Sequence, residues 1–248
     1  MAVAVITGVS RRIGIGAAVA RRLAEAGWDL FLHSWSPHDA EQPWGADPEG
    51  AAAIVDDLRT RVRVEHLVAD LADPDAPAQL VAAAEGAYGR VDALVANHAR
   101  SSVATLEELT AAELDFSYAV NTRATLLLVK EFAARCPGPG RVVLMTSGQH
   151  RGPMPGELPY IASKGALHQV TASLAAHLAP RGITVNAVDP GATDTGYADA
   201  VAHAAVLALE PMGRWGEPDD AARLIAWLAS DAGRWVTGQV LVSNGGGP

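Results

Sequence analysis

Residues 2–16 read Ala-Val-Ala-Val-Ile-Thr-Gly-Val-Ser-Arg-Arg-Ile-Gly-Ile-Gly, and they give the strongest indication of the fold. The segment 2–7 is a short, nearly all-apolar run, which is typical of a strand buried on both faces. Glycines follow at 8, 14 and 16, and residues 17–26 then show the periodicity of a helix. A strand, a glycine loop and a helix in this order offer free backbone N–H groups and the positive end of a helix dipole to a pyrophosphate. The alternative is a tight strand-to-helix turn with no ligand.

The same alternation continues along the chain. Further apolar runs of four to six residues occupy 29–33, 64–69, 93–96, 141–146, 183–188 and 239–242. Stretches with helical character occupy 49–60, 76–88, 105–134, 158–178 and 219–228. Strands that alternate with helices favour a parallel sheet with right-handed crossovers. We therefore expect an α/β chain with a Rossmann-type, doubly wound, seven-stranded parallel sheet, in a single domain over residues 1–248.

Composition excludes several classes of function. The chain has 28 acidic and 19 basic residues and a net charge of −9, with no Lys/Arg run, which argues against a nucleic acid or an anionic membrane as partner. Its one cysteine, Cys136, rules out an internal disulfide and a cysteine-based zinc site, and the histidines show no metal-binding spacing, so no metal is expected. No stretch reaches 18 apolar residues, and the N-terminal run lacks the basic flank of a signal peptide. The expected location is cytoplasmic.

The second apolar run bears on the choice of dinucleotide. Folds that bind NAD place a carboxylate roughly 20 residues past the glycines, where it holds the ribose 2′-hydroxyl. Residues 31–36 read Phe-Leu-His-Ser-Trp-Ser and contain no acid. Ser34 can donate to a phosphate there, and Arg11 or Arg12 can neutralise it. The sequence therefore favours NADP(H); NAD(H) is the alternative, if Asp39 turns back to the ribose.

The chemistry is indicated by Tyr160-Ile-Ala-Ser-Lys164. Residues four apart share one face of a helix. An ammonium roughly 5 Å from the phenol oxygen would lower its pKa by about two units from roughly 10, which suits general acid–base catalysis. Ser147 follows the run 141–146, at the sheet edge where ligands bind, and can hydrogen-bond a substrate oxygen. The alternatives are a surface cation–phenol pair and a capping serine.

Together with several further motifs, these residues resemble the short-chain dehydrogenase/reductase family over residues 3–247. The motifs are the glycine loop 7–16, Asp70-Leu71, 96–99, Asn121, Ser147, Tyr160-x-x-x-Lys164, 186–191, 213–218 and 237–239. The pattern is most similar to 3-oxoacyl-[acyl-carrier-protein] reductase-like members.

The resemblance implies four catalytic residues. Tyr160 would protonate the carbonyl oxygen in reduction, or act as the base in oxidation. Lys164 would lower the pKa of Tyr160 and hold the cofactor ribose, and Ser147 would polarise the carbonyl. Asn121 would kink its helix and hold a water that relays protons to Lys164.

The resemblance also implies a set of cofactor contacts. Asp70 and Leu71 would bracket the adenine, and Thr193 and Thr195 would touch the nicotinamide amide. With the glycine loop, the full expected set is Gly8, Ser10, Arg11, Arg12, Gly14, Ile15, Gly16, Ser34, Asp70, Leu71, Asn97, Tyr160, Lys164, Pro190, Gly191, Thr193 and Thr195.

The chain departs from the family pattern in three places, one of which is Asn244, where the family has an aspartate. Two extra residues separate Gly8 from Gly14, so the glycine loop should bulge. The segment 96–99 reads Ala-Asn-His-Ala where the family has Asn-Asn-Ala-Gly, so that Ala99 would crowd the ribose.

The substrate site is expected between the loops 148–158 and 192–212, the second of which continues as a mostly apolar helix and can serve as a lid. An apolar lid suits a hydrophobic ketone, including a 3-oxoacyl thioester. Arg151 would either bind an anionic substrate or face solvent. The expected function is NADP(H)-dependent interconversion of a carbonyl and a secondary alcohol.

Three other functions are alternatives to this one. They are an NAD(H)-dependent alcohol dehydrogenase of the same fold, a non-catalytic dinucleotide sensor, and a serine hydrolase. The hydrolase would need Gly-x-Ser-x-Gly, which residues 145–149 lack. The stretches 105–134 and 158–178 carry more apolar positions than one sheet face covers, and the family packs these helices between subunits. A homotetramer or homodimer is therefore expected.

Overall fold

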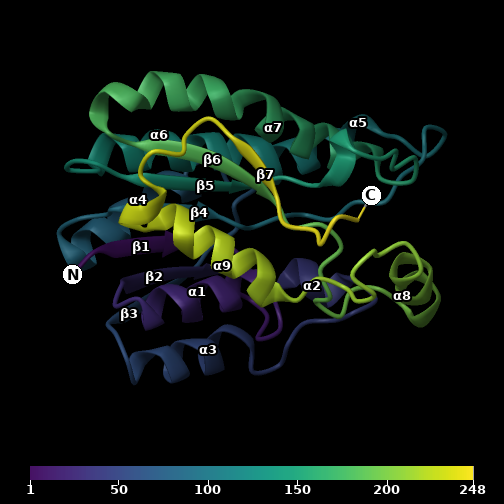
Figure 1. Cartoon of the computed structure of the whole chain (residues 1–248), viewed down its shortest axis with the longest axis horizontal. Coiled ribbons are helices and arrows are strands. Elements are labelled where there is room, and N and C mark those ends of the chain that lie inside the picture. The colour runs from purple at the N-terminus through teal and green to yellow at the C-terminus, as the bar shows by residue number, and fades with distance from the viewer. Residues whose placement is uncertain (248) are drawn as a thin grey trace.

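Seven parallel strands form one sheet in the computed structural model, which describes residues 1–247. Their order across the sheet is β3-β2-β1-β4-β5-β6-β7, so the direction of winding reverses between β1 and β4 (Figure 1). This arrangement confirms the predicted doubly wound α/β fold. The strands are β1 Val3–Ile6, β2 Asp29–Ser34, β3 Val64–Val68, β4 Ala93–Ala96, β5 Arg141–Met145, β6 Thr184–Asp189 and β7 Val240–Val242.

Alternate residues of each central strand enter two separate cores. In β1, Ala4 and Ile6 pack into one core and Val5 into the other. In β5, Val143 and Met145 face the first core while Val142 and Leu144 face the second. Because successive side chains of a strand point to opposite faces, a strand buried on both faces must be apolar throughout. The short, fully apolar runs of the sequence reflect this burial.

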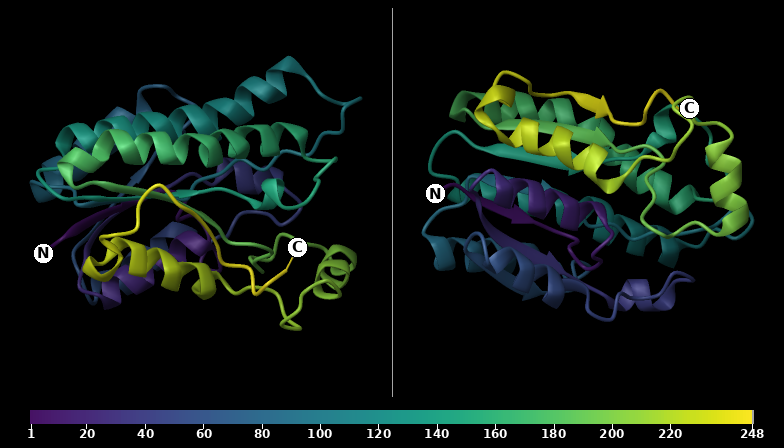
Figure 2. Two further views of the ribbon diagram at one scale, coloured as in Figure 1. Left: turned by 45° about the horizontal axis from the view of Figure 1, so that its top comes forward. Right: turned by 60° about the horizontal axis from the view of Figure 1, so that its bottom comes forward.

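Helices cover both faces of the sheet (Figure 2). The first core lies under α1, α3 and α9, and the second lies under α4, α6 and α7. Two short helices, α2 and α8, lie beyond the carboxyl ends of the strands (Figure 1). The helix bounds are α1 Ile15–Glu25, α2 Pro37–Glu41, α3 Gly50–Arg59, α4 Ala76–Tyr88, α5 Ala111–Ser117, α6 Ala124–Arg135, α7 Leu158–Leu178, α8 Ala200–Leu207 and α9 Pro218–Ala229. No helix within residues 1–247 is both long and apolar enough to cross a membrane.

The predicted helix over 105–134 is wrong at its beginning. Residues 106–108 form a turn, which is closed by the side chain of Glu108 as it accepts hydrogen bonds from the backbone N–H and the hydroxyl of Thr105. The helix begins after Thr110, whose hydroxyl caps it by accepting from the Glu113 N–H at 3.2 Å. Between α5 and α6 the backbone widens into one π-helical segment, η1, at Tyr118–Arg123. Such π-bulges occur frequently at functional sites.

Candidate active site

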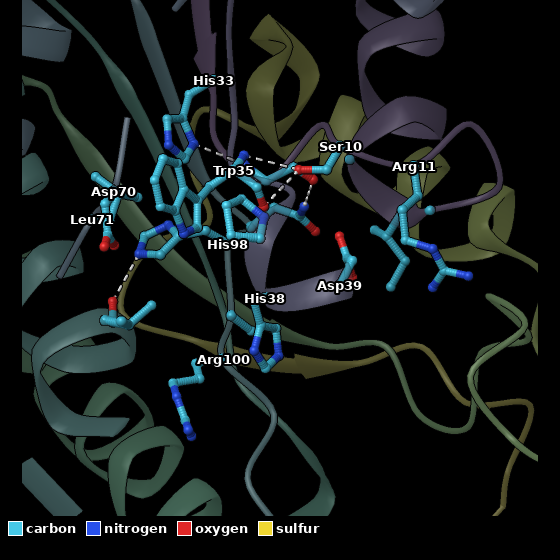
Figure 3. Close-up of a pocket in the computed structure, with 18 of the residues that line it drawn as sticks. Ser10, Arg11, His33, Trp35, His38, Asp39, Asp70, Leu71, His98 and Arg100 are labelled. Atoms are coloured by element: carbon cyan, nitrogen blue, oxygen red, sulfur yellow. Dashed lines mark hydrogen bonds between the residues drawn. The ribbon is translucent and has the colours of Figure 1, made fainter. Parts of the chain in front are cut away.

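Two adjoining clefts open at the carboxyl ends of the strands, beside the reversal between β1 and β4. Open α/β sheets bind ligands at this position. The glycine-loop cleft, of about 380 Å³, is lined by Gly8, Ser10, Arg11, Gly14, Ile15, Gly16, His33, Trp35, Pro37, His38, Asp39, Glu41, Asp70, Leu71, Asn97, His98, Ala99, Arg100, Phe116, Val120 and Thr195 (Figure 3). The tyrosine cleft, of about 320 Å³, is lined by Arg11, Ile15, His38, Asp39, Trp44, Ala99, Ser101, Thr146, Ser147, Met154, Glu157, Tyr160, Asp189, Pro190, Gly191, Thr193, Thr195 and Tyr197. Six residues line both, so the clefts form one continuous crevice.

The glycine loop forms a cradle that any side chain would fill. Gly8 has φ +72°, and a Cβ on it would lie 2.7 Å from the Cα of His98. A Cβ on Gly16 would lie 2.5 Å from the Gly8 carbonyl oxygen. Helix α1 begins after Gly14 with no side-chain cap and no acid in its first turn. Its first amides are therefore available to an anion, and the crevice fits the pyrophosphate of a dinucleotide.

His98 ties the glycine loop to the π-helical segment. Its Nε2 lies 3.0 Å from the Val120 carbonyl oxygen, which can only accept, so Nε2 carries the proton. Nδ1 therefore accepts from the Thr7 hydroxyl at 2.7 Å. Burial lowers the pKa of His98 to about 3, so the ring is neutral and this arrangement persists at neutral pH. Asn97 adds two bonds by donating from Nδ2 to the carbonyls of Thr7 and Gly8 at 3.1 and 3.0 Å.

The structure corrects the predicted cofactor contact of Arg12. Its backbone N–H and Nε donate to the Asp47 carboxylate at 3.0 and 2.9 Å, and its guanidinium also pairs with Glu49. These contacts hold the pKa of Asp47 well below its usual range. Arg12 lies in the two-residue insertion of the glycine loop and fastens that insertion to the segment before α3, outside both clefts. Arg11, by contrast, lines both clefts and its side chain has no ion-pair partner within residues 1–247.

Ser34 is a second correction. The residue is buried, and its hydroxyl lies 2.8 Å from Nε2 of His66 rather than in the cleft. Alternation at the end of β2 instead brings its neighbours His33 and Trp35 to the cleft wall, beside Asp70 and Leu71 (Figure 3). Burial lowers the pKa of His33 to about 4, and its Nδ1 accepts from the Gly8 N–H at 3.3 Å. The two residues that the end of β2 contributes to this part of the cleft, His33 and Trp35, are therefore aromatic and uncharged at neutral pH.

The end of α2 also reaches the crevice. Asp39 lines both clefts, and its carboxylate accepts from Nε1 of Trp44 at 3.0 Å. His38 lies beside it and accepts from the Ser101 N–H at 3.2 Å. These contacts hold α2 across the mouth of the crevice.

Tyr160 and Ser147 meet in the tyrosine cleft. Tyr160 lies in the first turn of α7 and is half-buried, while Ser147 follows the end of β5. Lys164 lies one turn further along α7, beneath the tyrosine, and is 1% exposed. Its Nζ is 5.9 Å from the centre of the Tyr160 ring and donates to the Met145 carbonyl oxygen at 2.9 Å. The i, i+4 spacing thus brings together the residues that the sequence paired.

The electrostatics of this pair differ from the sequence-based expectation. Burial raises the pKa of Tyr160 to about 12, and a hydrogen bond from Ser147 offsets only part of that rise. Burial also lowers the pKa of Lys164 to about 8. Desolvation disfavours the charged form of each group and outweighs their mutual attraction. In the structure as it stands Tyr160 is therefore a protonated phenol at neutral pH.

Asn121 lies in η1 and is fully buried. Its Nδ2 donates to the Arg100 carbonyl oxygen at 3.0 Å and to Oγ of Ser163 at 2.9 Å, and its Oδ1 accepts from the Arg100 N–H at 2.7 Å. The side-chain amide is therefore already hydrogen-bonded within the protein, and its bond to Ser163 joins η1 to α7 one residue before Lys164. Neither Asn121 nor Lys164 lines a cleft.

The turn after β6 forms the wall opposite Ser147. Pro190, Gly191 and Thr193 line the tyrosine cleft, and Thr195 lines both clefts. Gly191 has φ +64°, and a Cβ there would lie 2.4 Å from Cβ of Asn244. Thr193 is buried, and its hydroxyl donates to the Pro190 carbonyl oxygen at 3.0 Å. This turn is therefore rigid where the nicotinamide end of a dinucleotide would lie.

Both interpretations of Arg151 are wrong. Its Nε donates to the buried carboxylate of Asp189 at 3.0 Å, and its Nη1 donates to the Gly247 carbonyl oxygen at 2.9 Å. The side chain is 20% exposed and lines neither cleft. Arg151 therefore neither faces solvent nor meets a substrate, and instead joins β6 to the C-terminal segment.

Several residues of the crevice were not among the site residues named from the sequence, although Glu157 and Tyr197 lie within the loops 148–158 and 192–212 that were expected to form the substrate site. His33 and His98 were visible, the first in the window searched for a carboxylate and the second as a departure from a family motif. Glu157 lies three residues before Tyr160, a spacing that shares a helix face. Tyr197 and Trp44 lie on segments far apart in sequence and meet edge to face at 6.3 Å between ring centres. Within residues 1–247 no group of acidic, histidine or cysteine side chains is placed to hold a metal.

Known proteins resemble this chain in sequence and in structure. A family model described as "Enoyl-(Acyl carrier protein) reductase" matches residues 8–247. An uncharacterized oxidoreductase of Bacillus subtilis, YjdA, is 42% identical over 98% of this chain and 96% of its own. A short-chain dehydrogenase/reductase from Serratia marcescens superposes with a TM-score of 0.88 at 32% identity, covering 99% of this chain and 97% of that one. A blue fluorescent protein from a metagenomic library, solved in complex with NADPH, gives 0.89 at 35% identity over 99% and 97% of the two chains.

Proposed function

The chain belongs to the short-chain dehydrogenase/reductase family of oxidoreductases, and from that premise we propose that it reduces a ketone to a secondary alcohol with NADPH. One observation carries the proposal. Ser147 and Tyr160 line a cleft that is continuous with the glycine cradle, so a carbonyl group in the first can lie beside a cofactor in the second. A dinucleotide sensor would not need this pair.

The chain's own residues account for the proton chemistry. When bound, the reduced nicotinamide supplies the hydride to the carbonyl carbon. Ser147 would hydrogen-bond the carbonyl oxygen, and Tyr160 would donate its phenol proton to that oxygen as negative charge develops there. Because burial keeps Tyr160 protonated at neutral pH, the site is prepared for reduction. The buried ammonium of Lys164 would stabilise the phenolate that remains.

Arg11 supports NADPH as the cofactor. It is the arginine of the glycine loop that remains available, because Arg12 is bound to Asp47 and Glu49. The end of β2 offers no carboxylate to a ribose 2′-hydroxyl, since His33 and Trp35 occupy that wall. The metagenomic neighbour was solved with NADPH. A guanidinium in this position pairs well with a 2′-phosphate.

We further propose that the chain assembles as a homotetramer and acts in the cytoplasm. Two apolar surfaces support assembly. One surrounds α5, where Phe116 and Tyr118 are exposed, and the other adjoins β7, where Trp235 is 93% exposed. Exposed apolar surface of this kind marks interfaces. Light scattering that shows a monodisperse monomer would overturn the assembly, and fractionation of the source cells tests the location.

The activity is tested with a panel of ketones and alcohols, including a 3-oxoacyl thioester, by following nicotinamide absorbance with NADPH and NADH in parallel. We expect ketone-dependent oxidation that is faster with NADPH. Equal or better kcat/KM with NADH would overturn the cofactor choice. Absence of turnover with every ketone, together with tight binding of NADPH, would favour the sensor.

A further inference from the structure

Glu157 places a free carboxylate in the tyrosine cleft. It stands at the N-cap position of α7, yet its side chain makes no capping hydrogen bond. Within residues 1–247 that carboxylate has no hydrogen-bond or ion-pair partner, and burial raises the pKa of Glu157. A half-buried carboxylate without a partner loses hydration and gains nothing in return. Such a group on the wall of a binding cleft is suited to a ligand.

The backbone around Glu157 is held on both sides. Glu157 bridges to Ala104, where the Ala104 N–H donates to Gly156 at 2.8 Å and the Leu158 N–H donates to Ala104 at 3.2 Å. The Ile161 N–H then donates to the Glu157 carbonyl at 2.9 Å as the helix begins. The carboxylate is therefore attached to a fixed point, three residues before Tyr160 at the start of α7.

Glu157 lines the same cleft as Tyr160 and Tyr197, the phenol from the turn before α8. Burial raises the pKa of both phenols, and the negative charge of Glu157 adds to both rises. A ligand bonded to Glu157 would therefore occupy the cleft in which Tyr160 meets the carbonyl.

The other acidic groups of the tyrosine cleft are already engaged. Asp39 accepts from Trp44, and Asp189 accepts from Arg151 and from the Gly191 N–H. The cation Arg11 lies where the tyrosine cleft joins the glycine-loop cleft, at the cofactor side. Among the three acidic residues that line this cleft, Glu157 is thus the one whose carboxylate has no protein partner within residues 1–247.

We propose that Glu157 is a substrate-recognition residue, whose carboxylate accepts a hydrogen bond from a donor group beside the ketone. The donor is a hydroxyl or an ammonium, so the substrate class is the hydroxy- or aminoketone. Trp44, Tyr197 and Met154 line the same cleft and would pack against the apolar body of such a molecule. The inference rests on the proposed ketone reduction and adds the identity of the neighbouring group.

Matched ketones test the inference with NADPH as cofactor. The probes are 2-hydroxyacetophenone, its methyl ether 2-methoxyacetophenone, and protonated 2-aminoacetophenone. For the wild type we expect kcat/KM at least about tenfold higher for a donor-bearing ketone than for the ether. Glu157→Ala should remove that preference, while Glu157→Gln, which keeps an acceptor without charge, should lose it for the ammonium more than for the hydroxyl. Glu107→Gln, at an exposed glutamate, should retain the full preference.

The outcomes separate the two proposals. If the wild type reduces all three ketones at similar kcat/KM, or if Glu157→Ala slows all three equally, recognition by Glu157 is wrong while the reductase stands. If no ketone is reduced although NADPH binds, the reductase itself fails. A preference for the hydroxyl alone, or for the ammonium alone, supports recognition and identifies the donor. NADPH affinity should be unchanged in both Glu157 variants, because the residue lies outside the glycine-loop cleft.

Discussion

Lys164 donates a hydrogen bond from its ammonium to the Met145 carbonyl oxygen at 2.9 Å while it is only 1% exposed. Burial lowers its pKa to about 8, against 10.5 for an exposed lysine. Between these values the unfolded chain binds more protons than the folded one, so the free energy of unfolding should rise with pH through that window. Below pH 8 the buried charge costs the fold up to about 3 kcal/mol.

Lys164→Met should therefore stabilise the protein at pH 7 while it abolishes most turnover. Methionine fills similar space without a charge to desolvate, although the bond to Met145 is lost. Urea unfolding at pH 7 and pH 10 is the measurement, with Lys130→Met, an exposed lysine, as the control. A variant less stable than the wild type at pH 7, or one that keeps the rise in stability between pH 8 and 10, would contradict this account.

Tyr160→Phe should reduce kcat by a factor of about 10² to 10⁴, since it removes the proton donor and little else. The ring still packs beneath the cleft, so the fold and the affinity for NADPH should persist. Single-turnover rates and NADPH titration by fluorescence measure the two effects. Tyr118→Phe, at an exposed tyrosine, provides the matched control. Unchanged ketone turnover in Tyr160→Phe would remove Tyr160 from the mechanism.

Arg11 lines both clefts, whereas its neighbour Arg12 is paired with Asp47 and Glu49. Substitutions of these two arginines should therefore have different effects on cofactor binding. Arg11→Ala should weaken NADPH binding by roughly 10- to 100-fold and NADH binding much less, because a charge-assisted bond to the 2′-phosphate is lost. Arg12→Ala releases Asp47 and Glu49 and should affect both cofactors to the same degree. The Kd values of both variants for NADPH and for NADH test this prediction. If Arg11→Ala weakens both cofactors equally, Arg11 does not read the 2′-phosphate.

The sequence predicted most of the fold because apolar runs indicate burial, and β1, β2, β4, β5 and β6 are short runs buried in one sheet, while the edge strands β3 and β7 are partly exposed. It also predicted the residues whose position follows from local spacing. The Tyr160–Lys164 pair needs only one helical turn, and Gly8 and Gly16 need only the glycine loop. The pKa of Tyr160 could not be predicted in the same way, because the expected lowering counted the attraction of Lys164 and left out desolvation.

The contacts of side chains whose partners come from distant segments could not be predicted from the sequence. Arg12 and Asp47 are 35 residues apart, and Ser34 and His66 are 32 apart. Nothing in the neighbouring sequence indicates either pairing. Arg12 and Ser34 were therefore predicted to bind the phosphate, although in the fold their side chains bond to Asp47 and His66 instead. Trp44 and Tyr197 likewise meet only because α2 and the turn before α8 lie at the same end of the sheet.

Arg151 neutralises the carboxylate of Asp189 through an ion pair at 3.0 Å. Asp189 is 1% exposed, so removal of its guanidinium partner leaves a buried carboxylate with the Gly191 N–H as its remaining donor. Arg151→Met should therefore destabilise the fold by about 3 kcal/mol, measured by urea unfolding. Asp189→Asn in the same chain should recover part of that loss, because no charge is then left buried, and the double-mutant cycle gives their coupling. Anionic substrates should gain no affinity from Arg151, since it lies outside both clefts. A selective loss of anionic substrates in Arg151→Met, with stability unchanged, would restore the substrate-binding role that the structure denies it.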